Sequence, residues 1–213
     1  MINTPEELYR AILAFKPGVE TSVCSLHKPC KGHPLCCSTS TTEVLDFDAV
    51  EKELAMGKRS NLPSCDGVTL NLEQSVFCFV EIKGWNEFVK HNINVVDASL
   101  TEDSRKKIEE QVERYNLRGK LAHSMDVCEE IANDSELFLK LPFLYVIVTD
   151  IENNISAVED IATNLSLLAE TSSVWAFCDN AMKKQMDTLD GTVMKVYTHC
   201  RDYIANVNFR ITA

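Results

Sequence analysis

The segments CDGVTLN at residues 65–71 and VFCFVEIKG at residues 76–84 predict the centre of the fold, a β-hairpin. Both are rich in the β-branched and aromatic residues that strands favour. Because side chains alternate across a strand, Phe79, Glu81 and Lys83 share one face of the second segment. Its two faces are both apolar for most of its length. The segment therefore predicts a central strand that is covered on both sides.

The charged residues of this hairpin are predicted to meet at one end. A turn at residues 73–74 would pair Asp66 with Glu81, and Lys83 would lie on the same face. A shift of one residue in the register would move Asp66 to the other face. The turn lacks the Asn-Gly or Asp-Gly pair that would fix the register. The pairing of Asp66 with Glu81 is therefore a hypothesis that depends on the turn.

Two facing carboxylates supply the oxygen ligands that Mg²⁺ or Mn²⁺ prefers. The carbonyl oxygen of Ile82 would add a third ligand. Lys83 could then orient an attacking water or stabilise charge on a phosphate. A plain ion pair between Lys83 and either Asp66 or Glu81 explains the same residues without any catalysis. The pattern leaves both interpretations open.

The combination of Pro63-Ser-Cys-Asp66, a hairpin and Glu81-Ile-Lys83 resembles the PD-(D/E)xK nuclease superfamily. The resemblance implies an α/β fold with a restriction-endonuclease-like mixed sheet flanked by helices. It also implies that Asp66 and Glu81 are Mg²⁺ ligands and that Lys83 is the catalytic lysine. Hydrolysis of DNA phosphodiester bonds, in defence, restriction or repair, is the activity that follows from this resemblance.

A second segment, Gln111-Val-Glu-Arg-Tyr115, is similar to the Gln-x-x-x-Tyr helix of the exonuclease branch of that superfamily. Residues four apart share a helix face, so both side chains can point at the sheet. An ordinary core tyrosine with a glutamine at its edge is the alternative. The superfamily also has an acidic residue on the helix before the hairpin, for which Glu43, Glu51 and Glu53 are all candidates.

Residues 24–37 form a separate segment that is rich in cysteine and histidine, CSLHKPCKGHPLCC. Its candidate soft ligands for a metal are Cys24, His27, Cys30, His33, Cys36 and Cys37. Zn²⁺ takes four thiolate or imidazole ligands in a tetrahedron. The spacing does not reproduce the separated ligand pairs of common structural zinc sites. A zinc site and a surface loop with scattered soft side chains both remain open.

Length and composition indicate one globular domain over residues 1–213. The chain has 45% hydrophobic residues, with 7 Gly and 6 Pro, which argues against long flexible linkers. The resemblance to the nuclease superfamily implies a nuclease-like core at about 43–150, with an extension at 151–213. Nine cysteines without an export signal predict reduced thiols or metal ligands in the cytoplasm, not a disulfide framework. No apolar run approaches the roughly 18 residues of a membrane span.

The formal net charge of −11 opposes long-range attraction to nucleic acid. This conflicts with DNA as the expected partner, unless a basic partner protein supplies positive surface. Two alternatives to an active nuclease therefore stay open. One is a catalytically inactive binding or assembly protein with the same fold, and the other is a zinc-binding regulatory protein.

Apolar periodicity and capping residues predict the remaining elements. Helices are expected at 5–15, 46–56, 157–170 and 174–189, together with a long helix from about 102 to 128 for which Gly119 is a candidate break. A helical turn is expected around Trp85 and Phe88. Strands are expected at 143–149, 193–197 and 207–211.

Overall fold

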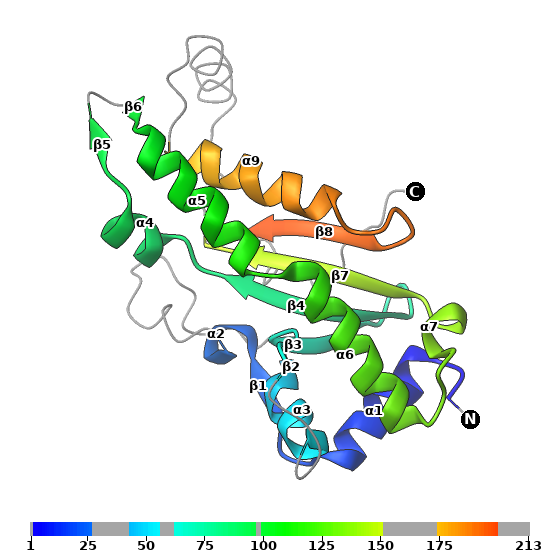
Figure 1. Cartoon of the computed structure of the whole chain (residues 1–213). Helices are drawn as coiled ribbons and strands as arrows, with labels where there is room; N and C mark the ends of the chain where they lie inside the picture. The colour runs from blue at the N-terminus through cyan, green and yellow to red at the C-terminus, as the bar shows by residue number, and fades with distance from the viewer. Residues whose placement is uncertain (1, 27–42, 56–61, 97–98, 151–173, 200–213) are drawn as a thin grey trace.

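A six-stranded mixed sheet forms the centre of the protein (Figure 1). The computed structural model describes residues 2–26, 43–55, 62–96, 99–150 and 174–199. The strand order is β1-β2-β3-β4-β7-β8. The bounds of these strands are β1 Glu20–Ser22, β2 Glu43–Asp46, β3 Gly67–Asn71, β4 Val76–Lys83, β7 Phe143–Thr149 and β8 Met194–His199. The predicted mixed α/β class is confirmed.

The hairpin of β3 and β4 has the predicted turn. The strands pair antiparallel from Gly67 opposite Val80 to Asn71 opposite Val76, which leaves residues 72–75 as the connection. Continuing this register by one pair beyond Gly67 places Asp66 opposite Glu81. The alternative register, shifted by one residue, is therefore excluded.

Strand β4 lies in the interior of the sheet, as its sequence predicts. It pairs with β3 on one edge and runs parallel to β7 on the other, while β7 in turn runs parallel to β8. Phe77 and Phe79 enter the larger hydrophobic core on one face of the sheet. Cys78 and Val80 enter a second cluster on the opposite face. Both faces of β4 are buried.

The larger core lies between the sheet and a layer of helices. These helices are α1 (Pro5–Phe15), α3 (Phe47–Ala55), α5 (Glu102–Arg114), α6 (Leu117–Ala132) and α9 (Val174–Asp187). In Figure 1, α5 and α6 pass in front of the sheet, and α9 runs along β8. Helix α1 begins as predicted, because the Thr4 hydroxyl accepts a hydrogen bond from the Glu7 N–H at 3.2 Å.

Shorter elements complete the described part of the chain. They are α2 (Val23–Leu26), α4 (Asn86–Asn92), α7 (Leu137–Lys140) and a hairpin of β5 (Val95–Val96) with β6 (Ser99–Leu100). Helix α4 contains Phe88 and follows Trp85, as expected from the sequence.

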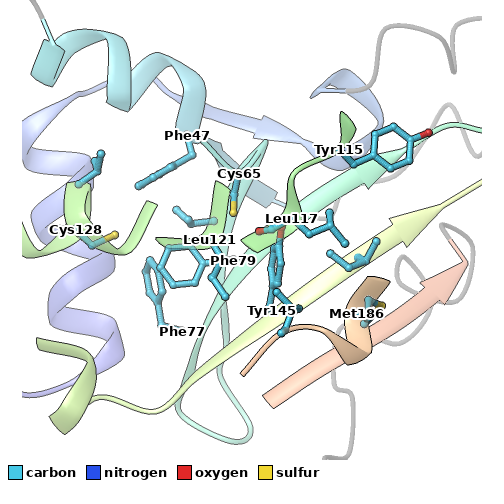
Figure 2. Close-up of a cluster of buried hydrophobic side chains, with 14 of the residues drawn as sticks. Phe47, Cys65, Phe77, Phe79, Tyr115, Leu117, Leu121, Cys128, Tyr145 and Met186 are labelled. Atoms are coloured by element: carbon cyan, nitrogen blue, oxygen red, sulfur yellow. The ribbon is translucent and has the colours of Figure 1, made fainter. Parts of the chain in front are cut away.

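Aromatic side chains fill the core beneath α3 and α6 (Figure 2). The ring centres of Phe77 and Phe79 lie 5.2 Å apart. The Phe47 ring packs edge-on against the Phe79 ring, with 6.4 Å between their centres. Tyr145 of β7 donates a hydrogen bond from its hydroxyl to the Leu117 carbonyl at 3.3 Å. This bond joins the buried centre of the sheet to the first residue of α6.

The long helix predicted after residue 101 is two helices, and the predicted break is in the wrong place. The chain leaves α5 at Tyr115, and Asn116 takes a left-handed conformation with φ 48° and ψ 47° before α6 begins. Asparagine tolerates this conformation better than most residues. Gly119 lies inside α6, where the space for a Cβ atom is taken by the Asn116 side chain.

Four other predicted elements are confirmed: α1, α3, β7 and α9 match the expected ranges to within a few residues. The predicted strand at 193–197 corresponds to β8. The expected helix at 157–170 and strand at 207–211 lie outside the described residues. Across the described helices, none combines the length and apolar character needed to cross a bilayer.

Candidate functional site

The two predicted carboxylates lie on the same side of the sheet, where β3 begins and β4 ends. Asp66 directly precedes β3, and its carboxylate oxygen Oδ2 accepts a hydrogen bond from the Ile82 N–H of β4 at 2.6 Å. Glu81 is completely buried, whereas the Asp66 side chain is 25% exposed. The site therefore combines a buried carboxylate, Glu81, with a second carboxylate, Asp66, that solvent can reach.

Two lysines occupy the space between these acids. The Lys83 ammonium contacts Glu81 Oε1 and lies 3.7 Å from Asp66 Oδ2. The Lys120 ammonium lies 2.6 Å from the same Glu81 Oε1 and 3.7 Å from Asp66 Oδ1. Because each ammonium reaches both carboxylates, the four side chains form one charged cluster.

Lys120 was not predicted from the sequence. It lies in the first turns of α6, the helix that follows α5 across the face of the sheet (Figure 1). A single lysine in an amphipathic helix has no distinguishing pattern, so the sequence offers no signal for it. Its assignment needed the packing of α6 on the sheet.

Burial raises the pKa of Glu81, and the nearby Asp66 charge raises it further. Lys83 and Lys120 act in the opposite direction and favour the ionised carboxylate. Burial also disfavours the charge of Lys120, but the attraction of Glu81 and Asp66 outweighs this cost and raises its pKa. The net effect is a raised pKa for Glu81, so the two lysines compensate only in part for placing a carboxylate inside the protein.

One oxygen of the cluster remains unsatisfied. Glu81 Oε2 is buried and has no hydrogen-bond partner among the described residues. A buried carboxylate oxygen without a partner is costly, and native proteins rarely leave one without a reason. Of the four buried side-chain atoms without a partner among the described residues, Glu81 Oε2 is the one that belongs to the charged cluster.

Tyr115 and Gln111 lie on the helix side of the cluster. Lys83 Nζ is 5.2 Å from the centre of the Tyr115 ring, and the Gln111 side chain hydrogen-bonds to Tyr115. Trp85 packs edge-on against the same ring at 5.7 Å. The structure thus places Tyr115 at the predicted site, beside Lys83. Gln111 contacts Tyr115, so its link to the two acids is indirect.

Helix α6 is fixed to the site at a second point. The Ser124 hydroxyl accepts a hydrogen bond from the Cys65 N–H at 2.8 Å, and both residues are fully buried. Cys65 directly precedes Asp66, and Ser124 lies one helical turn after Lys120. This bond therefore sets the position of Lys120 relative to Asp66.

The upstream acidic residues have other partners. Glu51 lies 3.5 Å from the His123 ring, and both side chains are buried. Glu53 pairs with Lys16 at 2.5 Å, while Glu43 is exposed on β2. Among the described residues, no group of three or more His, Cys, Asp or Glu side chains is arranged to hold a metal ion.

A divalent ion at this site would therefore rely on two carboxylates and on backbone or water oxygens. Asp66 and Glu81 offer carboxylate oxygens, one of them unsatisfied, and the Ile82 carbonyl lies 3.1 Å from Lys83 Nζ. Mg²⁺ commonly binds through one or two carboxylates and keeps several waters. The donor set fits such an ion, provided that an ammonium group gives way.

The predicted cysteine and histidine ligands cannot be placed. His27, Cys30, His33, Cys36 and Cys37 lie outside the described residues, and only the backbone of Cys24 is described, in α2. The zinc site and the surface loop therefore both remain predictions.

Comparisons of the chain with models of protein families, with curated proteins and with solved structures find no match.

Proposed function

We propose that this protein is a metal-dependent nuclease of the PD-(D/E)xK type, with the restriction-endonuclease-like fold. The observation that carries the proposal is the convergence of Asp66, Glu81 and Lys83 where two adjacent strands begin and end, with Glu81 Oε2 buried and unsatisfied. The mixed sheet with helices packed over one face supports it further. DNA is the proposed substrate.

Each side chain has a distinct role in this proposal. Asp66 and Glu81 hold Mg²⁺ or Mn²⁺, and the Ile82 carbonyl is a further candidate ligand. When bound, the ion would polarise the phosphodiester and lower the pKa of an attacking water. Lys83, held between the carboxylates and the Tyr115 ring, stabilises negative charge on the phosphate.

Tyr115 and Gln111 position Lys83 and do not touch the scissile bond. The ring of Tyr115 lies over the ammonium of Lys83, and Gln111 and Trp85 hold the ring in place. Contacts of this kind restrict the directions in which the lysine side chain can point.

Cleavage assays test the proposal directly. Supercoiled plasmid, a single-stranded DNA oligonucleotide and an RNA of the same sequence would be incubated with the protein and Mg²⁺ or Mn²⁺, with EDTA as a blank. We expect metal-dependent cleavage of DNA. Lys83→Ala should reduce the rate by roughly 10²- to 10³-fold, as when one preorganised charge-stabilising group is lost.

Asp66→Asn and Glu81→Gln should abolish metal-dependent cleavage, because they keep the shape of the side chains and remove the charge. Lys106→Ala is the matched control, since this lysine of α5 is 74% exposed and pairs only weakly at 3.9 Å with Glu110. Equal cleavage by the wild type and Lys83→Ala would contradict the catalytic assignment.

A second candidate function is a binding or assembly module with the same fold and no activity. The balance of two ammonium groups against two carboxylates favours it, as does the net charge of −11. A basic partner protein would then supply the positive surface that nucleic acid requires. Binding of the same oligonucleotides without cleavage under any metal, measured by fluorescence anisotropy, would support this candidate.

A further inference from the structure

Lys120 lies where a bound cation would be expected. Its ammonium is 2.6 Å from Glu81 Oε1 and 3.7 Å from Asp66 Oδ1, so it bridges the two proposed metal ligands. The adjacent Glu81 Oε2 is buried and unsatisfied. The cluster therefore contains a positive charge supplied by the protein and an oxygen that this charge does not satisfy.

The charges of the cluster do not leave room for both lysines and a divalent ion. Two carboxylates balance two ammonium groups, and a divalent cation placed among them would add an uncompensated excess of positive charge. Like charges a few ångströms apart in a shielded site repel one another strongly. Binding of the ion therefore requires one ammonium group to move away.

The contacts of the two lysines indicate which one moves. Lys83 also donates a hydrogen bond to the Ile82 carbonyl at 3.1 Å and lies under the Tyr115 ring. In the described part of the chain, the ion pairs and the hydrogen bond of the Lys120 ammonium are to the two carboxylates alone. Ser124 fixes the α6 backbone to Cys65, so the long Lys120 side chain can move while the helix stays in place.

We propose that Lys120 is an internal counter-ion that holds the site together without a metal and is displaced when a divalent ion binds. This inference rests on the proposed metal site. Displaced from the carboxylates, Lys120 faces the same side of the sheet as Lys83 and becomes available to contact the phosphate of a bound strand. The ion and the Lys120 ammonium thus compete for Asp66 and Glu81.

Chemical labelling of lysines in the wild-type protein tests this competition. The protein would be acetylated briefly with and without saturating Mn²⁺, after isothermal titration calorimetry has measured Mn²⁺ binding, and labelled peptides would be quantified by mass spectrometry. We expect the labelling of Lys120 to rise at least about fivefold with Mn²⁺, the lower end of ordinary coupling effects. The labelling of Lys83 and of the exposed Lys106 should not change.

Lys120→Met provides a second measurement, because methionine preserves the apolar stem and removes the competing charge. The variant should bind Mn²⁺ at least about fivefold more tightly than the wild type. Lys106→Met should bind as the wild type does.

The outcomes separate the two proposals. Mn²⁺ binding with unchanged labelling of Lys120, or with equal or weaker binding by Lys120→Met, would overturn the inference and leave the proposed nuclease standing. Absence of Mn²⁺ binding to the wild type at millimolar concentration would overturn both.

Discussion

Glu81 shows how far a single residue can be interpreted from its place in the sequence. A glutamate near the end of an apolar strand predicts a charge that needs compensation, and the spacing to Lys83 predicts one partner. Both expectations hold, since Lys83 contacts Glu81. The second partner, Lys120, depends on how α6 packs across the sheet, which no local pattern encodes.

Ser124 offers a test at the scale of one hydrogen bond. Ser124→Ala removes the acceptor of the buried Cys65 N–H. A buried donor left without a partner costs roughly 1–3 kcal/mol, so the free energy of unfolding should fall by that amount. Urea unfolding followed by circular dichroism measures the change.

Thr188→Ala is the matched control, because the Thr188 hydroxyl is exposed and donates to the nearby Gln185 carbonyl. Its effect should be a few tenths of a kcal/mol, in the range of surface substitutions. If both variants lost the same stability, the hydrogen bond between Ser124 and Cys65 would contribute no more to the free energy of unfolding than an exposed hydrogen bond does.

At the scale of elements, periodicity predicted the central hairpin and most of the described helices because each has a strong apolar pattern. The division between α5 and α6 was placed wrongly, since Asn116 rather than Gly119 takes the left-handed conformation. The short strands β1 and β2 were not predicted. They are three and four residues long, and their pairing partners rather than their own sequences define them.

Gly67 lies where β2 and β3 approach each other closely beside the site. A Cβ atom at this position would lie 2.9 Å from Leu26 Cδ1 and 3.1 Å from the Leu45 carbonyl oxygen. The backbone of β2 cannot move away without disturbing the pairing of Asp46 with Gly67. Gly67→Ala should therefore destabilise the protein by roughly 1–3 kcal/mol, as overpacking usually does.

Gly191→Ala is a suitable comparison, because a Cβ atom there meets nothing within 4 Å. Thermal unfolding of both variants distinguishes the crowded site from the open one. Equal melting temperatures would mean that Leu26 and β2 adjust to the added methyl group at no cost.

At the scale of the whole molecule, the sequence predicted the fold class and the convergence of Asp66, Glu81 and Lys83. These follow from alternation along strands and from the length of one turn. The order of the parallel strands and the position of α6 could not be predicted, because they depend on contacts between segments far apart in the chain.

Buried tyrosines should make the protein sensitive to alkaline pH. Burial is the main cause that raises the pKa of Tyr115 to about 12, against an ordinary value near 10. The unfolded chain therefore loses this proton first, and the stability that Tyr115 contributes is complete below pH about 10 and is lost as pH rises towards 12.

Urea unfolding between pH 9 and 12 measures this dependence. The free energy of unfolding of the wild type should fall more steeply than that of Tyr115→Phe above pH 10, by at most about 1.4 kcal/mol per pH unit. Below pH 9 the two curves should run parallel. Parallel curves over the whole range would show that the Tyr115 hydroxyl ionises equally in both states.

The parallel pairing of β4 with β7 has a consequence for biosynthesis. The β4 strand leaves the ribosome with α5 and α6 still to be made before β7, its neighbour on one side, exists. Because translation adds roughly 5–20 residues per second, this apolar strand edge of the nascent chain stays uncovered for seconds. During that interval Glu81, which is buried in the finished fold, remains in water. The exposed edge is the part of the growing polypeptide that a chaperone would need to shield.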